Sequence, residues 1–351
     1  MLDRRSAAGP RRGVRTTRVA VPTAAAALLV VGVVSIALGR YPVPVGHVVE
    51  VLVGQLTGNA YPGPATEQDV VTLVRLPRVL LGALVGGGLA VGGVALQAAF
   101  RNPLVSPQVI GVSSGASFGG ALALVLGLGT GYLVASAFVF GMAALGVVFL
   151  VTAGRGGASM LMIVLGGVVT GSFFTALVSL LTYLADPYST LPAIVFWLLG
   201  SLATATFGKV LVAAVPVLVG FAVLLALRWR INVLSLGDED AAAVGIRPRP
   251  VRWTLLTAVA LIVAGAVAVS GVIGWVGLVI PHLVRMWVGP DHRVLLPVSF
   301  LVGAAFLVTV DTLARTLSGG EIPLGVLTAL VGAPAFFVLL RRNRDRIWDR
   351  A

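Results

Sequence analysis

The sequence predicts an all-α protein that crosses a membrane about ten times within one membrane domain. Three observations predict this fold class. The chain of 351 residues is 58% hydrophobic and 11% charged, it contains 44 glycines, and its mean hydropathy is +1.03. These values lie outside the range of soluble globular domains. The hydrophobic residues are also gathered in long runs, and arginines cluster where those runs end.

A helix needs about 20 apolar residues to cross the hydrocarbon core, and somewhat fewer where its ends are anchored. Such runs occupy residues 20–39, 79–100, 109–129, 132–153, 158–185, 210–227, 253–270, 272–288, 294–314 and 324–340. The first run is too long for the core of a secretory signal, so it is expected to remain as the first span. A further stretch, 191–206, is short, follows two prolines and contains Gly200, which favours a re-entrant or surface helix.

The loops predict the orientation. With the N-terminus in the cytoplasm, 20 of the 25 positive residues lie on the cytoplasmic side, and both termini are cytoplasmic. The five outside are Arg40, Arg75, Arg78, Lys209 and Arg315. The one sizeable external loop, 40–72, is broken by prolines and is predicted to be an irregular connector. The expected divisions are a basic cytoplasmic extension (1–18), a permease domain (19–342) and a basic tail (343–351).

Several kinds of site are not expected. The chain has no cysteine, which excludes disulfides and thiolate metal sites. Its three histidines lie in different segments, so neither a catalytic metal nor another cofactor is predicted. No Walker motif is present, and no basic stripe alternates with aromatics as in nucleic-acid-binding proteins. The glycines at 82–93 and 111–120 are spaced for close helix packing.

A charge-dense segment, residues 228–252, separates two apolar runs. Its middle predicts a short capped cytoplasmic helix. Asp238 can cap the first turn, Glu239 and Asp240 complement the helix dipole, and Gly245 can end the helix in a left-handed conformation. A rigid helix on a cytoplasmic loop is suited to contact a soluble partner.

The spans carry little charge. Asp311 is nearly alone and lies four residues before Arg315, a spacing that predicts an ion pair on one helix face. Ion-coupled carriers usually need a titratable group inside the membrane. Because neither such a site nor an ATP site is evident, we expect another subunit to supply the energy, attached at the capped helix.

Arg75 and Arg78 flank Pro77 near the predicted outer surface, against the usual charge bias. Two interpretations are open. The arginines can extend to lipid headgroups, or they can form a basic landing site for an acidic extracytoplasmic protein.

Together these segments resemble the FecCD family of ABC-transporter permeases over residues 71–342. Five strings carry the resemblance in order: RLPRVLLGALVGGGLAVGGVALQAAFRNPLVSPQVIGVSSGAS (75–117), FWLLGSL (196–202), LGDEDAAAVGI (236–246), GVIGWVGLVIPHLVRMWVGPDHRVLLP (271–297) and EIPLGVLTALVGAP (321–334). The resemblance implies a type II importer fold of ten helices, a second permease subunit (a copy or a paralogue), two cytoplasmic ATPases and an external substrate-binding protein. The chain itself would not be an enzyme.

The resemblance also implies site residues. The helix that couples to the ATPase would comprise Leu236, Gly237, Asp238, Glu239, Asp240, Ala241, Val244 and Gly245. Arg75, Arg78 and Arg315 would meet the binding protein. The cytoplasmic gate would include Arg101, Asn102, Pro103, Leu104, Ala158, Ser159 and Met160.

The expected function is import of a metal chelate through the cell membrane, first an iron(III)-siderophore, with cobalamin or haem next. A secondary carrier acting alone is the alternative from another class. A purely structural scaffold accounts poorly for the capped helix and the external arginines together.

Overall fold

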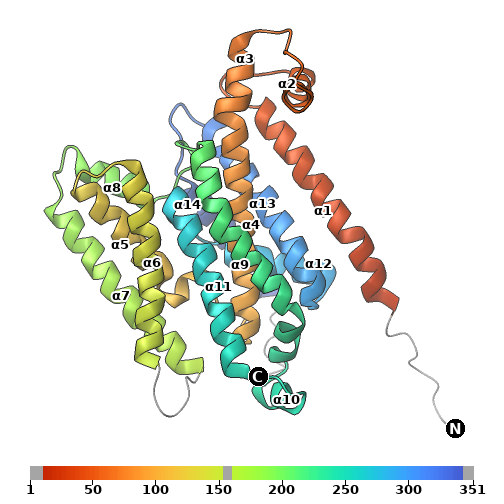
Figure 1. Ribbon diagram of the computed structural model, residues 1–351, viewed down its shortest axis with the longest axis vertical. Coiled ribbons are helices and arrows are strands. Elements are labelled where there is room, and N and C mark those ends of the chain that lie inside the picture. Colours follow the sequence, from red (N-terminus) through yellow and green to blue (C-terminus); the bar gives the residue numbers. More distant parts are fainter. Residues whose placement is uncertain (1–10, 153–159, 343–351) are drawn as a thin grey trace.

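The computed structural model describes residues 11–152 and 160–342, and within them the fold is helical with no strand (Figure 1). The longer helices are α1 (Arg11–Ala37), α4 (Leu76–Ala99), α6 (Thr130–Thr152), α7 (Met160–Leu184), α9 (Phe207–Leu234), α11 (Pro248–Ser270), α13 (His292–Thr316) and α14 (Leu324–Arg342). The shorter ones are α2 (Val45–Thr57), α3 (Ala65–Asp69), α5 (Val112–Val125), α8 (Thr190–Leu198), α10 (Asp238–Ala243) and α12 (Val276–Val288). A π-helical turn, η1 (Val70–Arg75), joins α3 to α4, and a 3-10 turn, η2 (Pro107–Ile110), precedes α5.

The ten predicted apolar runs coincide with helices. Seven helices of the described part are long and apolar enough to cross a membrane, and the remaining three runs form α5, α12 and α14, whose apolar parts are shorter. The stretch 191–206 contains α8, whose nine residues are too few to cross the hydrocarbon core. The prediction of an all-α, multi-pass membrane protein is therefore confirmed.

The segment 40–72, which was predicted to be external, differs in structure from its prediction. It was expected to be irregular, but it forms α2, α3 and the start of η1, and the helical run from Ala65 continues without interruption to Ala99. The prolines that suggested an irregular loop instead precede helices, since Pro44 is the N-cap of α2 and Pro64 that of α3. Proline suits the start of a helix because the first backbone N–H groups have no partner within it.

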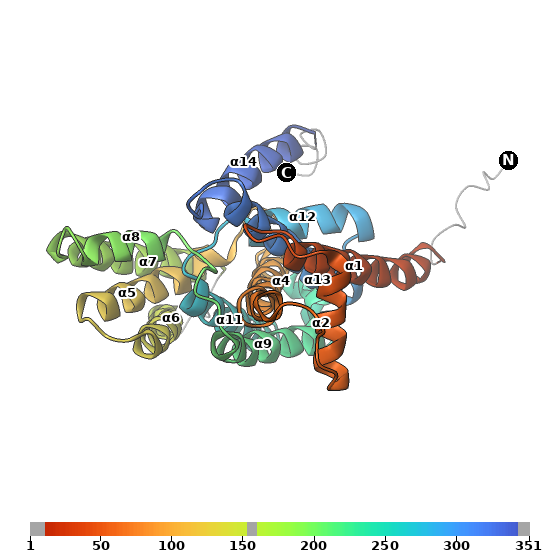
Figure 2. The ribbon, with the colours of Figure 1, turned by 90° about the horizontal axis from the view of Figure 1, so that it is seen from above.

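The core of the fold is built from α4, α11 and α13, which are mostly buried. Helices α1, α6 and α9 pack against them, and α7 lies farther out, against α5 and α6 (Figure 2). Glycine allows the inner helices to approach. A Cβ added to Gly86 of α4 would collide with the backbone of Gly303 in α13, and a Cβ on Gly93 would collide with the backbone of Gly277 in α12. The predicted role of these glycines in helix packing is confirmed at these two crossings.

The backbone is not helical between α11 and α12. Gly271 and Trp275 have φ angles of 68° and 67°, so the chain leaves α11 abruptly before α12 begins at Val276. Hydrogen bonds satisfy part of the backbone here: Ser201 N–H donates to Ser270 C=O, Gly271 N–H donates to Val267 C=O, and Val276 N–H donates to Gly274 C=O, each at 2.8 Å. Irregular backbone is tolerated at membrane depth only where such bonds exist. This break explains why α12 is shorter than its predicted run.

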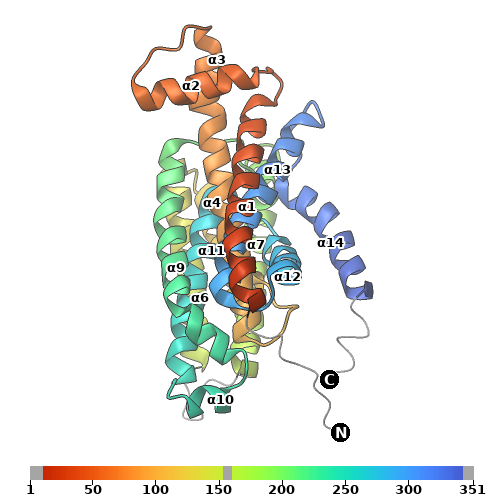
Figure 3. The same ribbon diagram turned by 90° about the vertical axis from the view of Figure 1, so that its right-hand side faces the viewer.

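The two ends of the molecule differ. Helix α10 lies at one end, beyond the long helices, and α2 and α3 lie at the other (Figures 1 and 3). Helix α1 begins and α14 ends toward the α10 end (Figure 3). This arrangement agrees with an even number of crossings. Which end faces the cytoplasm remains a prediction from the arginine distribution.

Candidate functional site

Helix α10 is held between the ends of α9 and α11. Its first residue, Asp238, accepts a hydrogen bond from Arg252 Nη2 in α11 at 2.7 Å. This corrects the predicted capping role of Asp238: Gly237 occupies the N-cap position, and the Asp238 carboxylate serves the Arg252 pair instead. The side chain of Arg252 is almost fully buried, so the pair fixes α10 to the membrane helix that follows it.

The end of α10 is a Schellman motif. Gly245 has a φ of 77°, its N–H donates to Ala242 C=O at 2.9 Å, and Ile246 N–H donates to Ala241 C=O at 2.9 Å. Ala241 and Ile246 pack with Leu234 of α9 and Val251 of α11 in a small apolar cluster. The left-handed stop predicted at Gly245 is confirmed, and the cluster packs α10 against the ends of α9 and α11.

The outer surface of α10 combines acidic and apolar groups. Glu239 and Asp240 are exposed, and Leu236 and Val244 on either side of the helix are 69% and 57% exposed. An apolar side chain at the water-facing end of a membrane protein costs free energy unless a partner covers it. Of the residues predicted to couple to the ATPase, six are exposed and form one accessible surface, namely Leu236, Asp238, Glu239, Asp240, Val244 and Gly245, whereas Gly237 and Ala241 are buried.

The predicted gate turn lies beside α10. Arg101 has a φ of 49°, and its guanidinium Nη1 lies 3.6 Å from the position that a Cβ on Gly237 would take. Asn102 Oδ1 accepts a hydrogen bond from Leu104 N–H at 2.9 Å, which closes the turn around Pro103. The sequence assigned the 101–104 turn and α10 to separate functions, but the structure brings Arg101 next to the start of α10.

The second predicted gate segment is only partly described. Met160 begins α7, whereas Ala158 and Ser159 lie outside the described residues. Their predicted role stays a prediction.

Sequence reasoning missed a polar cluster at the base of α9. Asn232 Nδ2 donates to Asp291 Oδ1 at 2.7 Å, and His292 N–H donates to Asn232 Oδ1 at 2.9 Å. Burial raises the pKa of Asp291, but the N–H of Arg293 and the amide of Asn232 outweigh it and leave that pKa below its usual value. The cluster ties α9, which leads into α10, to the start of α13. The one sign of this cluster in the sequence was Asn232, an uncharged polar residue within the charge-dense segment 228–252.

Two outer arginines cap the end of α1. Arg75 Nη1 donates to the carbonyls of Ile36 at 2.6 Å and Ala37 at 3.1 Å, and Arg315 Nη1 donates to Leu38 C=O at 2.6 Å. The last carbonyls of a helix lack partners within it and carry partial negative charge, so two guanidinium groups satisfy them well. Arg75 and Arg315 are only 5% and 8% exposed.

The third outer arginine, Arg78, is 7% exposed and joins two carboxylates. Its Nε and Nη2 donate to Asp311 at 2.8–3.0 Å, and its Nη1 and Nη2 donate to Glu321 at 2.8 and 3.0 Å. The predicted Asp311–Arg315 pair is a secondary contact, with 3.8 Å between Asp311 Oδ2 and Arg315 Nε. Glu321 was not predicted, because it follows α13 in a loop. Hydrogen bonds from Arg78 lower the pKa of Glu321.

Burial of the three arginines bears on both earlier interpretations. None of them extends to lipid headgroups, so that interpretation is wrong for these residues. A docking role for Arg75, Arg78 and Arg315 stays a prediction, and it requires their release from the partners described above.

A polar stripe follows one face of α7. Ser172, Thr175 and Ser179 are exposed at helical spacing in a helix that is mostly apolar. Together with Gln108 of η2 they line a groove of about 540 Å³. The hydroxyls of Thr175 and Ser179 donate to the carbonyls of Gly171 and Thr175 in the same helix, at 2.8 and 3.0 Å, and their oxygens remain able to accept hydrogen bonds from the groove. Among the described residues, no group of three histidine, aspartate or glutamate side chains is placed to hold a metal ion.

The chain resembles known transport proteins over most of its length. A profile of the FecCD transport family matches residues 27–342. The molybdate import system permease MolB of Haemophilus influenzae is 46% identical over 313 residues, which are 89% of this chain and 92% of the relative. The cobalamin import permease BtuC of Halobacterium salinarum is 38% identical over 331 residues, 94% of this chain and 88% of the relative.

Two more relatives carry other substrate names. A probable iron chelatin permease of Helicobacter pylori and the hemin permease HmuU of Yersinia pestis are each 41% identical, with alignments over 78% of this chain and 83% of the relative. The fold is also that of a solved ABC transporter of the metal-chelate type in an inward-facing conformation. That structure is 44% identical, has a TM-score of 0.83, and the match covers 92% of this chain and 98% of the other.

Proposed function

The chain belongs to the FecCD transport family and is a permease subunit of an ABC importer, and we propose that it carries an iron(III) chelate into the cytoplasm, driven by ATPase subunits bound at α10. Family membership removes the alternatives of a stand-alone secondary carrier and a structural scaffold. The position and surface of α10 carry the coupling part of the proposal.

Helix α10 is suited to transmit motion. It is joined to α11 through the Arg252–Asp238 pair, to α9 through the apolar cluster, and to the gate turn through the approach of Arg101 to Gly237. A partner that grips the exposed acidic and apolar surface therefore displaces both flanking spans and acts on the turn at 101–104. Such a contact transmits energy when its geometry differs between the two states of the transporter.

The conduit is proposed to run along the polar stripe of α7. Because this face is open in the single chain, we propose that a second permease subunit completes it across α7 and α14, which carry exposed apolar residues such as Val169 and Leu330. The groove residues are three hydroxyl side chains, the Gln108 amide, two glycines and the small apolar Val109, Val168 and Ala176, and none of them is charged. Such a lining provides hydrogen bonds for the oxygen-rich surface of a chelate without competing for its metal.

A unique thiol tests the attachment of the ATPase. Because the chain has no cysteine, a Val244→Cys variant carries a single reactive group on the exposed side of α10. We expect it to cross-link to the co-expressed ATPase, and a Val215→Cys variant on the exposed face of α9 to remain unlinked. Equal cross-linking of both variants would contradict docking at α10.

The substrate has two candidates. The uncharged lining of the α7 groove supports an iron(III) chelate, and the similarity to MolB supports molybdate. Uptake of labelled iron–siderophore and labelled molybdate by cells that express the complete importer separates them. We expect ATP-dependent uptake of the iron chelate. Uptake of molybdate alone would leave the importer mechanism intact but overturn the proposed substrate.

A further inference from the structure

A second hollow lies on the side of the molecule away from α14, between α6, α9 and α11 (Figure 2). It encloses about 950 Å³. None of its lining residues belongs to α7 or α10, so it is separate from the proposed conduit and from the ATPase surface. We propose that this groove is a binding site for one phospholipid, with the phosphate at Lys209 and an acyl chain along α9.

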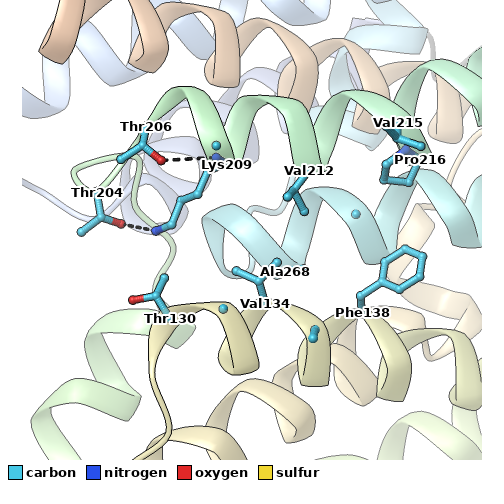
Figure 4. Close-up of a pocket in the computed structure, with 14 residues that line it drawn as sticks. Thr130, Val134, Phe138, Thr204, Thr206, Lys209, Val212, Val215, Pro216 and Ala268 are labelled. Carbon is cyan, nitrogen blue, oxygen red and sulfur yellow. Dashed lines mark hydrogen bonds between the residues drawn. The ribbon is translucent and has the colours of Figure 1, made fainter.

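The groove has a polar end and an apolar end (Figure 4). Thr130, Thr204, Thr206 and Lys209 lie at the polar end, which is at the beginning of α6 and α9. Farther along, its walls are apolar and include Val134, Phe138, Val212, Val215 and Pro216. This division matches an amphiphile whose head and tail occupy opposite ends.

Lys209 is the only lysine in the chain. Its Nζ donates to Thr204 Oγ1 at 2.6 Å, and within residues 11–152 and 160–342 no carboxylate forms an ion pair with it. An ammonium group has three N–H donors, so two remain for another acceptor. A phosphodiester supplies both the negative charge and the acceptor oxygens that this group lacks.

The depth of the lysine agrees with a headgroup site. Helix α9 has 28 residues and is therefore about 42 Å long, about 12 Å more than the hydrocarbon core. Lys209 is the third residue of this helix, which places it at headgroup level. From Lys209 to Pro216 the helix rises about 10 Å, so a chain that follows it stays within one leaflet.

The groove also opens toward lipid. Val212 and Val215 line it and are 52% and 60% exposed, and the neighbouring Leu211 and Leu218 of α9 are exposed as well. A membrane lipid can therefore enter from the side without passing through the bundle. A smaller cavity of about 250 Å³ shares Thr130, Thr204 and Lys209 with the groove, which enlarges the space around the proposed phosphate.

Photolabelling of the assembled importer tests the site. The probe is phosphatidylglycerol with a diazirine in the upper part of one acyl chain, incorporated in nanodiscs. We expect labelling to concentrate on the groove residues of α6 and α9. Lys209→Gln should lower it about fivefold, the factor for one lysine near a lipid surface, while Lys209→Arg should retain it. Arg40→Gln, which removes another outer positive charge away from the groove, should have no effect.

A pair of matched variants tests the apolar part. Val215→Trp fills the groove and should abolish the labelling of α6, whereas Leu218→Trp adds the same side chain to the lipid-facing surface outside it and should not. The proposal is overturned if label is spread evenly over the lipid-facing helices, or if Lys209→Gln and Val215→Trp both leave the pattern of the unmodified importer. Such results would mean that only ordinary boundary lipid is present.

Discussion

Replacing Asp311 with asparagine should destabilise the outer end of the bundle strongly. Asp311 is 2% exposed and accepts three hydrogen bonds from Arg78, whose guanidinium is nearly as buried. Loss of one member of a buried ion pair costs about 3–5 kcal/mol, because the other charge remains without compensation. Glu321 still contacts Arg78 after the change, so we expect the lower value, about 3 kcal/mol.

Equilibrium unfolding in mixed micelles, followed by tryptophan fluorescence, measures this change in the free energy of unfolding. Asp69→Asn is the matched control, since it makes the same chemical change at an exposed outer carboxylate and should alter the free energy by less than about 0.5 kcal/mol. The double variant Asp311→Asn with Glu321→Gln should lose more than the sum of the single changes, because Arg78 then has no carboxylate partner. A loss below about 1 kcal/mol for Asp311→Asn would refute the structural role of the pair.

Three further predictions follow from the same structure. Gly86→Ala should destabilise the protein by about 1–3 kcal/mol because its Cβ collides with the backbone of Gly303. Gly146→Ala, inside α6 on a surface with open space, should instead stabilise the protein by up to about 1 kcal/mol, because alanine favours the helix, when both are measured by unfolding. Gly245→Ala should cost about 1 kcal/mol by straining the left-handed stop of α10, and Gly245→Asn should cost less; protection of the α10 amides from hydrogen exchange reports the difference. The pKa of Glu321 is lowered in the folded state, so its stabilising effect is fully present above the ordinary value near 4.5 and is lost as the pH falls through the folded pKa. The difference in thermal stability between the unmodified protein and Glu321→Gln should therefore stay constant from pH 7 to about 5 and shrink only as the pH falls below 4.5.

The spans could be predicted from the sequence because few backbone structures can cross a membrane. Every crossing needs a long apolar segment, and each predicted run coincides with a helix. The stop at Gly245 was also predictable, because a left-handed C-cap depends on adjacent residues. The prediction of an irregular loop at 40–72 was wrong because proline is compatible with both a loop and the start of a helix. Local sequence does not decide between these two for Pro44 and Pro64.

The partners of the charged residues could not be predicted. Asp238 was assigned to its own helix from local preference, but it pairs with Arg252, 14 residues later. Arg78 pairs with Asp311, 233 residues away, and Arg75 caps a helix that ends 38 residues before it. Such contacts depend on how α1, α4 and α13 pack, which a single sequence does not contain. The spacing of Asp311 and Arg315 suggested an ion pair between them. In the structure Asp311 pairs mainly with Arg78, and Arg315 is a more distant contact.

The most direct test of the account is the coupling of ATP hydrolysis to transport in the reconstituted importer. The variant carries Glu239→Arg and Asp240→Arg, which reverse exposed charges of α10 and leave the half-buried Asp238–Arg252 pair in place. Arg249→Gln, an exposed change beside α10, is the control. We predict that the double variant remains in the membrane, loses ATP-driven uptake by at least about tenfold, and no longer binds the ATPase stably, while the control transports normally. Unchanged uptake by the double variant, with the ATPase still bound, would contradict the role of α10 as the coupling element.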